Sequence, residues 1–79
     1  MTNLEKYNQI FLDVFNIESD VLNEEFSFNN VSTWDSIAHM GLIAQLEEEF
    51  DVMLDTEDIL NFGSYENGKG ILTKNDIEL

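Results

Sequence analysis

The 79-residue sequence contains no cysteine and no proline, and only three of its residues are lysine or arginine. Without cysteine, the protein forms no disulfide, holds no metal through thiolates and has no thiol nucleophile of its own. It also contains no repeat and no low-complexity segment. The sequence therefore excludes disulfide-stapled folds, thiolate metal centres and catalysis by a cysteine of the chain.

The scarcity of cations leaves the protein strongly acidic, with 3 Lys and Arg against 17 Asp and Glu and a net charge of −14. A nucleic-acid-binding protein needs cations to displace the counterions of the phosphates, so this function is excluded. Binding to anionic membrane surfaces is disfavoured for the same reason. The charge favours basic partner proteins, whose association would be steered electrostatically and weakened by salt.

The length allows one domain, residues 1–79, with a single modest core. An apolar fraction of 43% is ordinary for a globular protein and argues against disorder. No apolar stretch approaches membrane-spanning length, and residues 1–7 show no basic segment followed by an apolar run. We expect a cytoplasmic monomer without membrane insertion.

The dominant hydrophobic period is helical. Thr2 and Glu5 fit a capping box, so a first helix should begin at Thr2 or Asn3. Its apolar face is formed by Leu4, Tyr7, Ile10, Phe11, Val14 and Phe15. The period fails in residues 16–34, where turn formers predict a long loop pinned to the core, with a short helical turn near Asp20. A loop of this length in a small domain hints at function.

A second helix is predicted to run from the Asp35 cap to Phe50. Its expected apolar stripe comprises Ile37, Met40, Ile43, Leu46 and Phe50, broadened by Leu42. Glutamates at positions 47–49 oppose the helix dipole, which is typical of a binding surface but fits a plain solvated face equally well. Trp34, directly before the cap, is expected to join the core or staple the loop onto the helix start.

A short third helix is predicted from Thr56, as its cap, to Phe62, with Gly63 as its stop. Ser64 can cap a fourth helix that continues through Leu72, although its two glycines, at 68 and 70, each weaken it by about 1 kcal/mol relative to alanine. The predicted fold class is therefore all-α: a small bundle of three longer helices and one short helix, with a long first loop.

Ser36 lies in the first turn of the second helix, where free N–H groups and the helix dipole favour an anion such as a phosphodiester. Serine is also common at such positions without any chemical role. A hydrolase using Ser36, with His39 as base and Asp35 as its partner, is rejected because one exposed helix provides no pocket and no oxyanion hole. His39 is instead expected to be a surface or partner-facing residue.

Two further features have a functional and a plain interpretation. The acidic residues at 51–58 do not match an EF-hand loop, so we predict no metal site there. Gly41, in the middle of the second helix, either permits close approach of a partner or is a neutral change at a solvated position.

Residues 34–40, Trp-Asp-Ser-Ile-Ala-His-Met, resemble the Asp-Ser-Leu modification motif of acyl carrier proteins. Residues 46–52, Leu-Glu-Glu-Glu-Phe-Asp-Val, are similar to that family's continuation of the same helix into the next loop. Residues 57–59 resemble the start of its short third helix, and Phe28 falls where the family places an aromatic residue. The resemblance covers nearly the whole chain in length and element order.

The resemblance implies a four-helix acyl-carrier-like bundle that is not itself an enzyme. It implies that Ser36 is esterified with 4′-phosphopantetheine from coenzyme A by a phosphopantetheinyl transferase, and that Asp35 supports recognition by this transferase. The arm's thiol would then carry an acyl or aminoacyl group as a thioester. Acyl-loading and acyl-transfer enzymes with basic docking patches would be the other partners. The residues matching the family's partner-docking surface are Ile37, Met40, Glu47 and Glu48.

The sequence departs from the pattern of fatty-acid carriers at positions 38, 41 and 44, where Ala38, Gly41 and Ala44 replace acidic or bulky residues. These changes reduce the acidic docking surface and favour a stand-alone carrier of a specialised pathway, such as polysaccharide or secondary metabolite assembly. Six phenylalanines are available to fill the interior, so we expect long acyl chains to be poorly buried. The alternative function is an unmodified acidic interaction module, such as a nucleic-acid mimic or an inhibitor of a basic protein.

Overall fold

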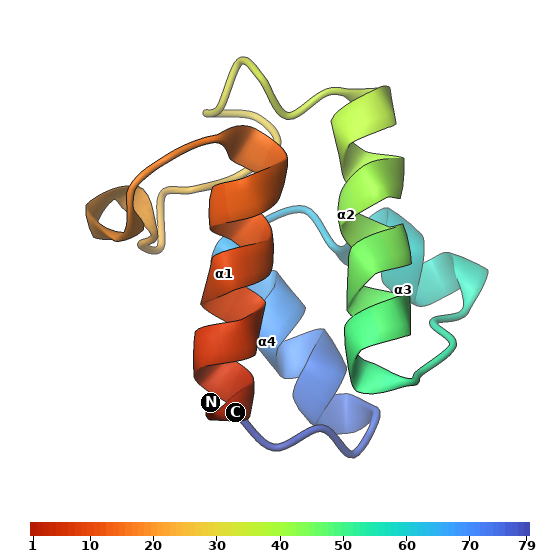
Figure 1. Ribbon diagram of the computed structural model, residues 1–79. Coiled ribbons are helices and arrows are strands. Elements are labelled where there is room, and N and C mark those ends of the chain that lie inside the picture. The colour runs from red at the N-terminus through yellow and green to blue at the C-terminus, as the bar shows by residue number, and fades with distance from the viewer.

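Four α-helices and no β-strand make up the protein, which we describe over residues 1–79 from a computed structural model. The helices are α1 (Asn3–Phe15), α2 (Ser36–Phe50), α3 (Thr56–Asn61) and α4 (Tyr65–Lys74), and a single 3₁₀ turn, η1 (Ser19–Val21), lies in the first connection. Figure 1 shows the chain rising through α1, crossing the top in that connection and descending through α2. The predicted all-helical bundle of three longer helices and one short helix is confirmed at this level.

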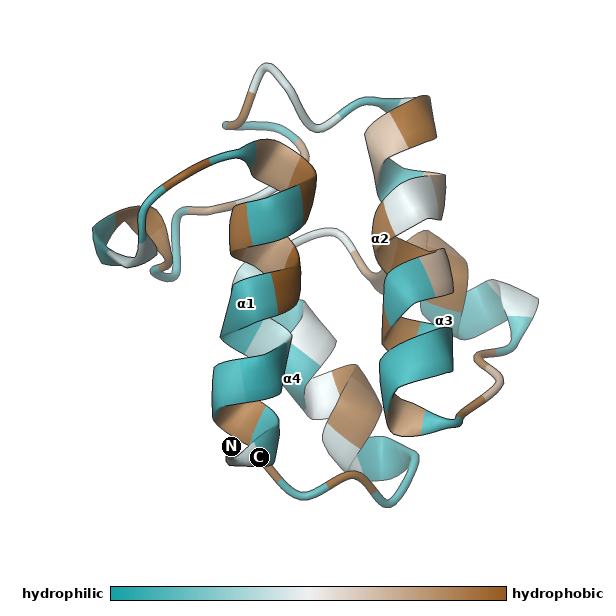
Figure 2. Ribbon diagram, viewed as in Figure 1, coloured by the Kyte–Doolittle hydropathy of each residue, from teal (hydrophilic) through white to brown (hydrophobic).

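The start of α1 is fixed by the predicted capping box. The Thr2 N–H donates to Glu5 Oε1 at 2.9 Å, and the Glu5 N–H donates to Thr2 Oγ1 at 3.1 Å. The helix ends where the period fails, at Asn16, whose φ of 54° is left-handed. The predicted face is largely confirmed: Tyr7, Ile10, Phe11 and Phe15 are buried, with Leu4 and Val14 packed against them. Figure 2 shows the hydrophobic positions of α1 on its side toward α2.

A single cluster of 14 buried residues forms the core and draws on every helix except α3. Phe11 lies at its centre, with ring centroids 5.0 Å from Tyr7, 5.3 Å from Tyr65 and 5.8 Å from Phe26. The rings of Tyr65 and Phe26 meet Phe11 edge to face, an arrangement that contributes about 0.5–1.5 kcal/mol beyond area burial. The interior is therefore dense with aromatic rings.

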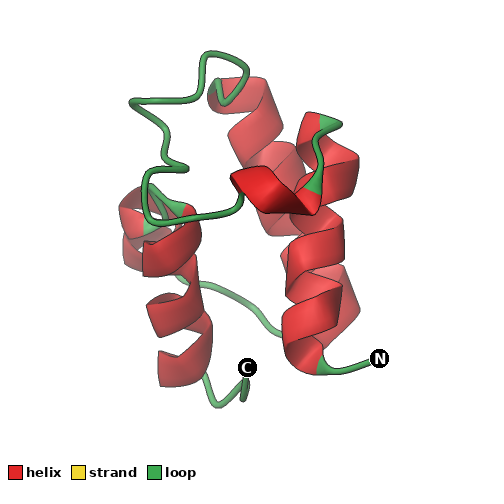
Figure 3. Cartoon of the chain, turned by 90° about the vertical axis from the view of Figure 1, so that its left-hand side faces the viewer, coloured by secondary structure: helices red, strands yellow, loops and turns green.

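The long first connection is pinned to the core, as predicted, and its helical turn is η1. Phe26 and Trp34 are 4% and 2% exposed, so both belong to the core. The connection also pairs with the segment between α3 and α4: the Phe28 N–H donates to the Gly63 carbonyl at 2.8 Å, and the Tyr65 N–H donates to the Phe26 carbonyl at 2.9 Å. Figure 3 shows the length of this loop, which crosses the end of the bundle where α2 begins.

The expected apolar stripe of α2 is wrong at its N-terminal end. Ile37 is 85% exposed and Met40 is 56% exposed, whereas Leu42, Ile43 and Leu46 are buried. Apolar residues surround the first three turns of α2 almost completely, so their spacing does not single out one face. The inward face passes instead through the half-buried Ala38 and His39.

The start of α3 is capped by Asp55, whose Oδ1 accepts from the Asp58 N–H at 2.8 Å. The prediction that Thr56 is the cap and that the helix continues to Phe62 is therefore wrong, since α3 ends at Asn61. Phe62 turns into the core and is fully buried, which breaks the helical path. Gly63 is not a left-handed stop, because no glycine in the protein has a positive φ.

Ser64 caps α4 as predicted, accepting from the Asn67 N–H at 3.0 Å. The tail after α4 folds back on the bundle: Ile77 is buried, and the Asn3 side-chain amide donates to the Glu78 carbonyl at 2.9 Å. The two ends of the chain therefore lie close together at the base of the bundle (Figure 1).

Candidate functional site

Ser36 is the first residue of α2 and is exposed. The preceding Asp35 caps the helix, with its Oδ1 accepting from the Ala38 N–H at 2.8 Å. The Ser36 hydroxyl has no hydrogen-bond partner in the protein, so no group of the chain competes for it. The structure thus presents an exposed serine beside a carboxylate that is fixed as the helix cap.

The first turn of α2 has the electrostatics that an anion on Ser36 would need. Asp35 uses its carboxylate on the Ala38 N–H and its carbonyl on the His39 N–H, at 2.8 Å in each case. The N–H groups of Ser36 and Ile37 have no acceptor within the helix, because the first N–H groups of any helix lack one. These donors and the positive end of the helix dipole favour a phosphodiester on this side chain.

The residues expected to dock partners are not all free at the surface. Ile37 and Met40 lie on an exposed, uncharged strip below Ser36 with Gly41 and Ala44, and Glu48 is exposed near the far end of α2. Glu47 is half-buried instead: its Oε2 accepts from the Leu54 N–H at 2.9 Å and holds the connection between α2 and α3. Their role in docking remains a prediction.

The space around Gly41 would admit a larger residue. A Cβ added there meets no atom of the protein within 4 Å. Packing within the chain therefore does not require glycine at this position, and close approach by a partner remains the functional interpretation.

His39 was expected to be a surface or partner-facing residue, but its ring is half-buried and is bonded within the protein. The Trp34 Nε1–H donates to His39 Nδ1 at 3.0 Å, and His39 Nε2 lies 2.8 Å from the Ile59 carbonyl oxygen. An indole nitrogen is only a donor, so Nδ1 accepts and the proton sits on Nε2, from which it is donated to Ile59. His39 thus links the first connection, α2 and α3, and we name this set the Trp34–His39–Ile59 bridge.

The bridge leaves no catalytic dyad at the helix start. A general base must offer a free nitrogen to the hydroxyl it activates, and both nitrogens of His39 are engaged. The Asp35 carboxylate, the third member of the rejected triad, is engaged as the cap of α2. Hydrolysis by Ser36 and His39 therefore has no support in the geometry.

A hollow of about 360 Å³ lies one helical turn below Ser36, between the first connection, α2 and the α3–α4 connection. Its lining combines apolar rings with polar groups: Phe28, Asn29, His39, Leu60, Phe62 and Gly63. Phe28 and Leu60 are 45% and 77% exposed at its rim. Apolar surface therefore gathers near the start of α2.

Asp58 is an important residue that sequence reasoning missed. It is only 2% exposed, yet it binds Lys74 in an ion pair and accepts from the Asn75 side-chain amide at 3.1 Å. The hydrogen bond from Lys74, then that from Asn75, lowers the pKa of Asp58 below its ordinary value of 3.8. Asp58 thus attaches α3 to the end of α4. In the sequence, Asp58 is only one of several acidic residues at positions 51–58.

The remaining acidic residues form no centre that could hold a metal, because no group of three or more His, Asp or Glu converges. None of the helices is both long enough and apolar enough to cross a membrane. Comparison of the chain with protein-family models, with characterised proteins and with solved structures finds no match.

Proposed function

We propose that the protein is an acyl carrier protein, with an acyl-carrier-like four-helix bundle, that carries an acyl or aminoacyl group as a thioester on a 4′-phosphopantetheine arm attached to Ser36. The observation that carries this proposal is the exposed, unbonded Ser36 hydroxyl at the capped start of α2, within a sequence resembling the carrier motif. The proposal includes that the chain is not an enzyme and works in the cytoplasm as a monomer.

The attachment step would form one ester bond. The Ser36 Oγ attacks the β-phosphorus of coenzyme A, the pyrophosphate bond breaks, and adenosine 3′,5′-bisphosphate leaves while the hydroxyl proton passes to the transferase or to water. Asp35 keeps the first turn of α2 formed and offers the transferase a negative charge beside the hydroxyl. When bound, 4′-phosphopantetheine supplies the thiol that this cysteine-free chain lacks.

The charge of the protein supports exchange between several partner enzymes. A net charge of −14 would steer association with basic docking patches and leave the complexes sensitive to salt. The uncharged strip of Ile37 and Met40 next to Ser36 would add apolar contact, and Glu48 would add charge at its far end. A specialised pathway fits the small, uncharged residues Gly41 and Ala44 within this strip.

The proposal is tested by incubating the protein with coenzyme A and a broad-specificity phosphopantetheinyl transferase, followed by intact mass measurement. We expect the mass to increase by one phosphopantetheinyl group, and Ser36→Ala to abolish the increase. Ser32→Ala is the matched control, since Ser32 is also an exposed serine of the same region and should not affect it. An unchanged mass, or an increase that survives Ser36→Ala, would leave the acidic interaction module as the better account.

A further inference from the structure

The Trp34–His39–Ile59 bridge closes the side of the bundle that lies nearest to Ser36. His39 lies three residues after Ser36 on the same helix, about 4.5 Å along its axis. Its ring centroid lies 6.1 Å from that of Trp34, at an interplanar angle of 27°, and its ring meets Phe28 at 6.3 Å and Phe62 at 6.4 Å edge to face. An imidazole held by two hydrogen bonds and enclosed by three rings therefore forms the wall between the hollow and the core.

Behind this wall the interior is already filled. Phe62 is fully buried and Trp34 is 2% exposed, and both lie within ring contact of Phe11. The five hollows of the protein all open to solvent, and none is enclosed within the core. An alkyl chain entering here would have to displace His39, leaving the buried indole N–H of Trp34 without an acceptor. It would also have to expand a close-packed core.

The hollow outside the wall offers little shelter for a long chain. Half of its six lining residues, Asn29, His39 and Gly63, are not hydrophobic. Its apolar rim residue Leu60 is 77% exposed, so a group lying there would remain largely in contact with water. For a short or polar group this contact with water costs little free energy, whereas a long alkyl chain would keep its apolar surface exposed.

We infer that the groups carried at Ser36 are short or polar acyl groups that stay outside the bundle, and that His39 is the residue that keeps the interior closed to them. This inference depends on the proposed function for the identity of the cargo. The closure of the bundle, however, is a property of the protein itself and can be measured without a transferase.

The test compares melting temperatures across a series of attached chains. Phosphopantetheinylated protein is loaded with acetyl, octanoyl or palmitoyl groups, and we expect no rise in melting temperature along the series. Burial of an octanoyl chain would raise it by more than about 10 °C, given the free energy of burying each methylene and the entropy of unfolding of a small domain. A progressive rise that persists on dilution would overturn the inference. A rise that disappears on dilution reports self-association through exposed chains and supports it.

A second experiment tests the closure of the bundle independently of the proposed function. Ser36→Cys creates the only thiol of the chain, so methyl, octyl and hexadecyl groups can be attached as disulfides with alkyl methanethiosulfonates. The hexadecyl chain is long enough to reach the hollow from position 36. If the transferase fails to modify Ser36, the proposed function fails, but this series still decides whether the bundle admits a chain.

The role of His39 is tested in the same series with His39→Ala and, as the conservative control, His39→Gln. His39→Ala removes the wall, so melting temperature should now rise with chain length. His39→Gln keeps a side chain with an acceptor oxygen at this position, so it should behave more like the wild-type protein. A folded His39→Ala variant that remains insensitive to chain length would overturn the role given to His39. The wild-type series decides the inference on the cargo even if this variant does not fold.

Discussion

Gly68 and Gly70 lie two residues apart on α4, but their surroundings are opposite. A Cβ at position 68 would overlap the Tyr7 hydroxyl and the Phe62 ring, whereas a Cβ at position 70 would meet no atom within 4 Å. Gly68 therefore permits the close packing of α4 against α1 and against Phe62. Gly70 only weakens the helix.

We predict that Gly68→Ala destabilises the protein by about 1–3 kcal/mol through overpacking, despite the better helix propensity of alanine. Gly70→Ala should stabilise it by up to about 1 kcal/mol, because only the propensity changes. Urea unfolding of both variants measures the difference. Equal effects of the two substitutions would contradict the packing role of Gly68.

Asp35 has a structural role and a proposed recognition role, which substitutions can separate. Asparagine is as good an N-cap as aspartate, so Asp35→Asn should retain stability, whereas Asp35→Ala should lose about 0.5–2 kcal/mol. If the charge supports the transferase, both variants should slow phosphopantetheinylation of Ser36. Rates from time-resolved mass measurement test this, and a normal rate for Asp35→Asn would assign Asp35 to capping alone.

At the scale of residues, the features that depend only on neighbours in the sequence could be predicted. The caps Thr2, Asp35 and Ser64 were predictable, because each needs only a side-chain oxygen and an N–H group three residues later. The roles of His39 and Gly68 were not predictable. Both depend on groups from other elements, Ile59 for the histidine and Tyr7 for the glycine, which no periodicity brings together.

At the scale of elements, α3 is the helix that depends most on polar contacts. It has only six residues and is tied to its neighbours by His39 from α2 and by Lys74 and Asn75 from the end of α4. Glu47 holds the connection that precedes it. A helix this short has little stability of its own, so these contacts set its position.

Asp58 should make the attachment of α3 sensitive to acid. Because Lys74 and Asn75 hold its pKa below 3.8, Asp58 contributes stability that is present above pH 3.8 and is lost as the pH falls through the lowered pKa. Asp58→Asn should be less stable than the wild-type protein at neutral pH, and the difference should narrow below pH 3.8. Urea unfolding at a series of pH values measures this. Asp20→Asn, on the exposed turn η1, is the control that removes one negative charge without breaking an ion pair. A difference that stays constant with pH would contradict the role of Asp58.

The orientation of α2 also shows what the sequence could not predict. Its position and both ends agree with the prediction from the Asp35 cap to Phe50. Its rotation does not, since apolar residues surround its first turns and the inward face is selected by Trp34 and His39. Ile37 and Met40 are consequently exposed beside Ser36 instead of contributing to the core.

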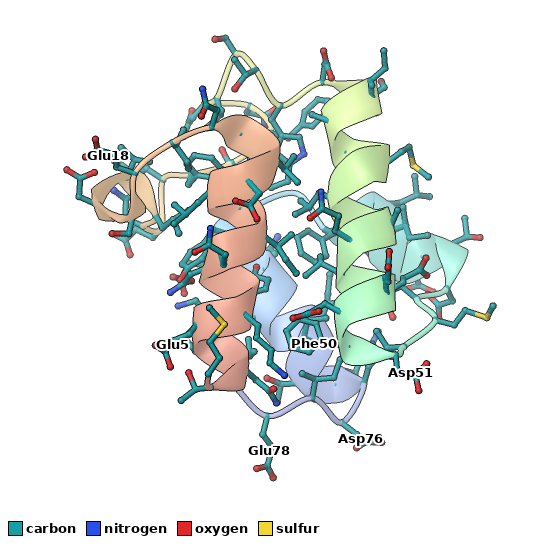
Figure 4. All side chains as sticks on the ribbon, in the orientation of Figure 1. Glu5, Glu18, Phe50, Asp51, Asp76 and Glu78 are labelled. Carbon is teal, nitrogen blue, oxygen red and sulfur yellow. The ribbon has the colours of Figure 1, made fainter.

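At the scale of the whole molecule, a net charge of −14 is confined to a body of 29 × 28 × 19 Å. Figure 4 shows the labelled carboxylates Glu18, Asp51, Asp76 and Glu78 pointing outward from different sides of the bundle. Only Lys69 and Lys74 form ion pairs with acidic residues. Like charges therefore repel across most of the surface and oppose the compact state.

We predict that salt stabilises the protein. Screening at high ionic strength shortens the range of these repulsions, and the gain should be on the order of 1 kcal/mol, or about 4–8 °C in melting temperature. Thermal melts in increasing NaCl measure it, with a non-ionic osmolyte at equal osmolality as the control. A melting temperature that is unchanged or falls with NaCl would show that repulsion does not limit stability.

The central claim is that Ser36 is the point where a prosthetic arm is attached. Its most direct test is to treat the protein with coenzyme A and a phosphopantetheinyl transferase and to locate the added mass by fragmentation. We predict one phosphopantetheinyl group, carried by Ser36. An unmodified protein, or a group located on any other residue, would contradict the account.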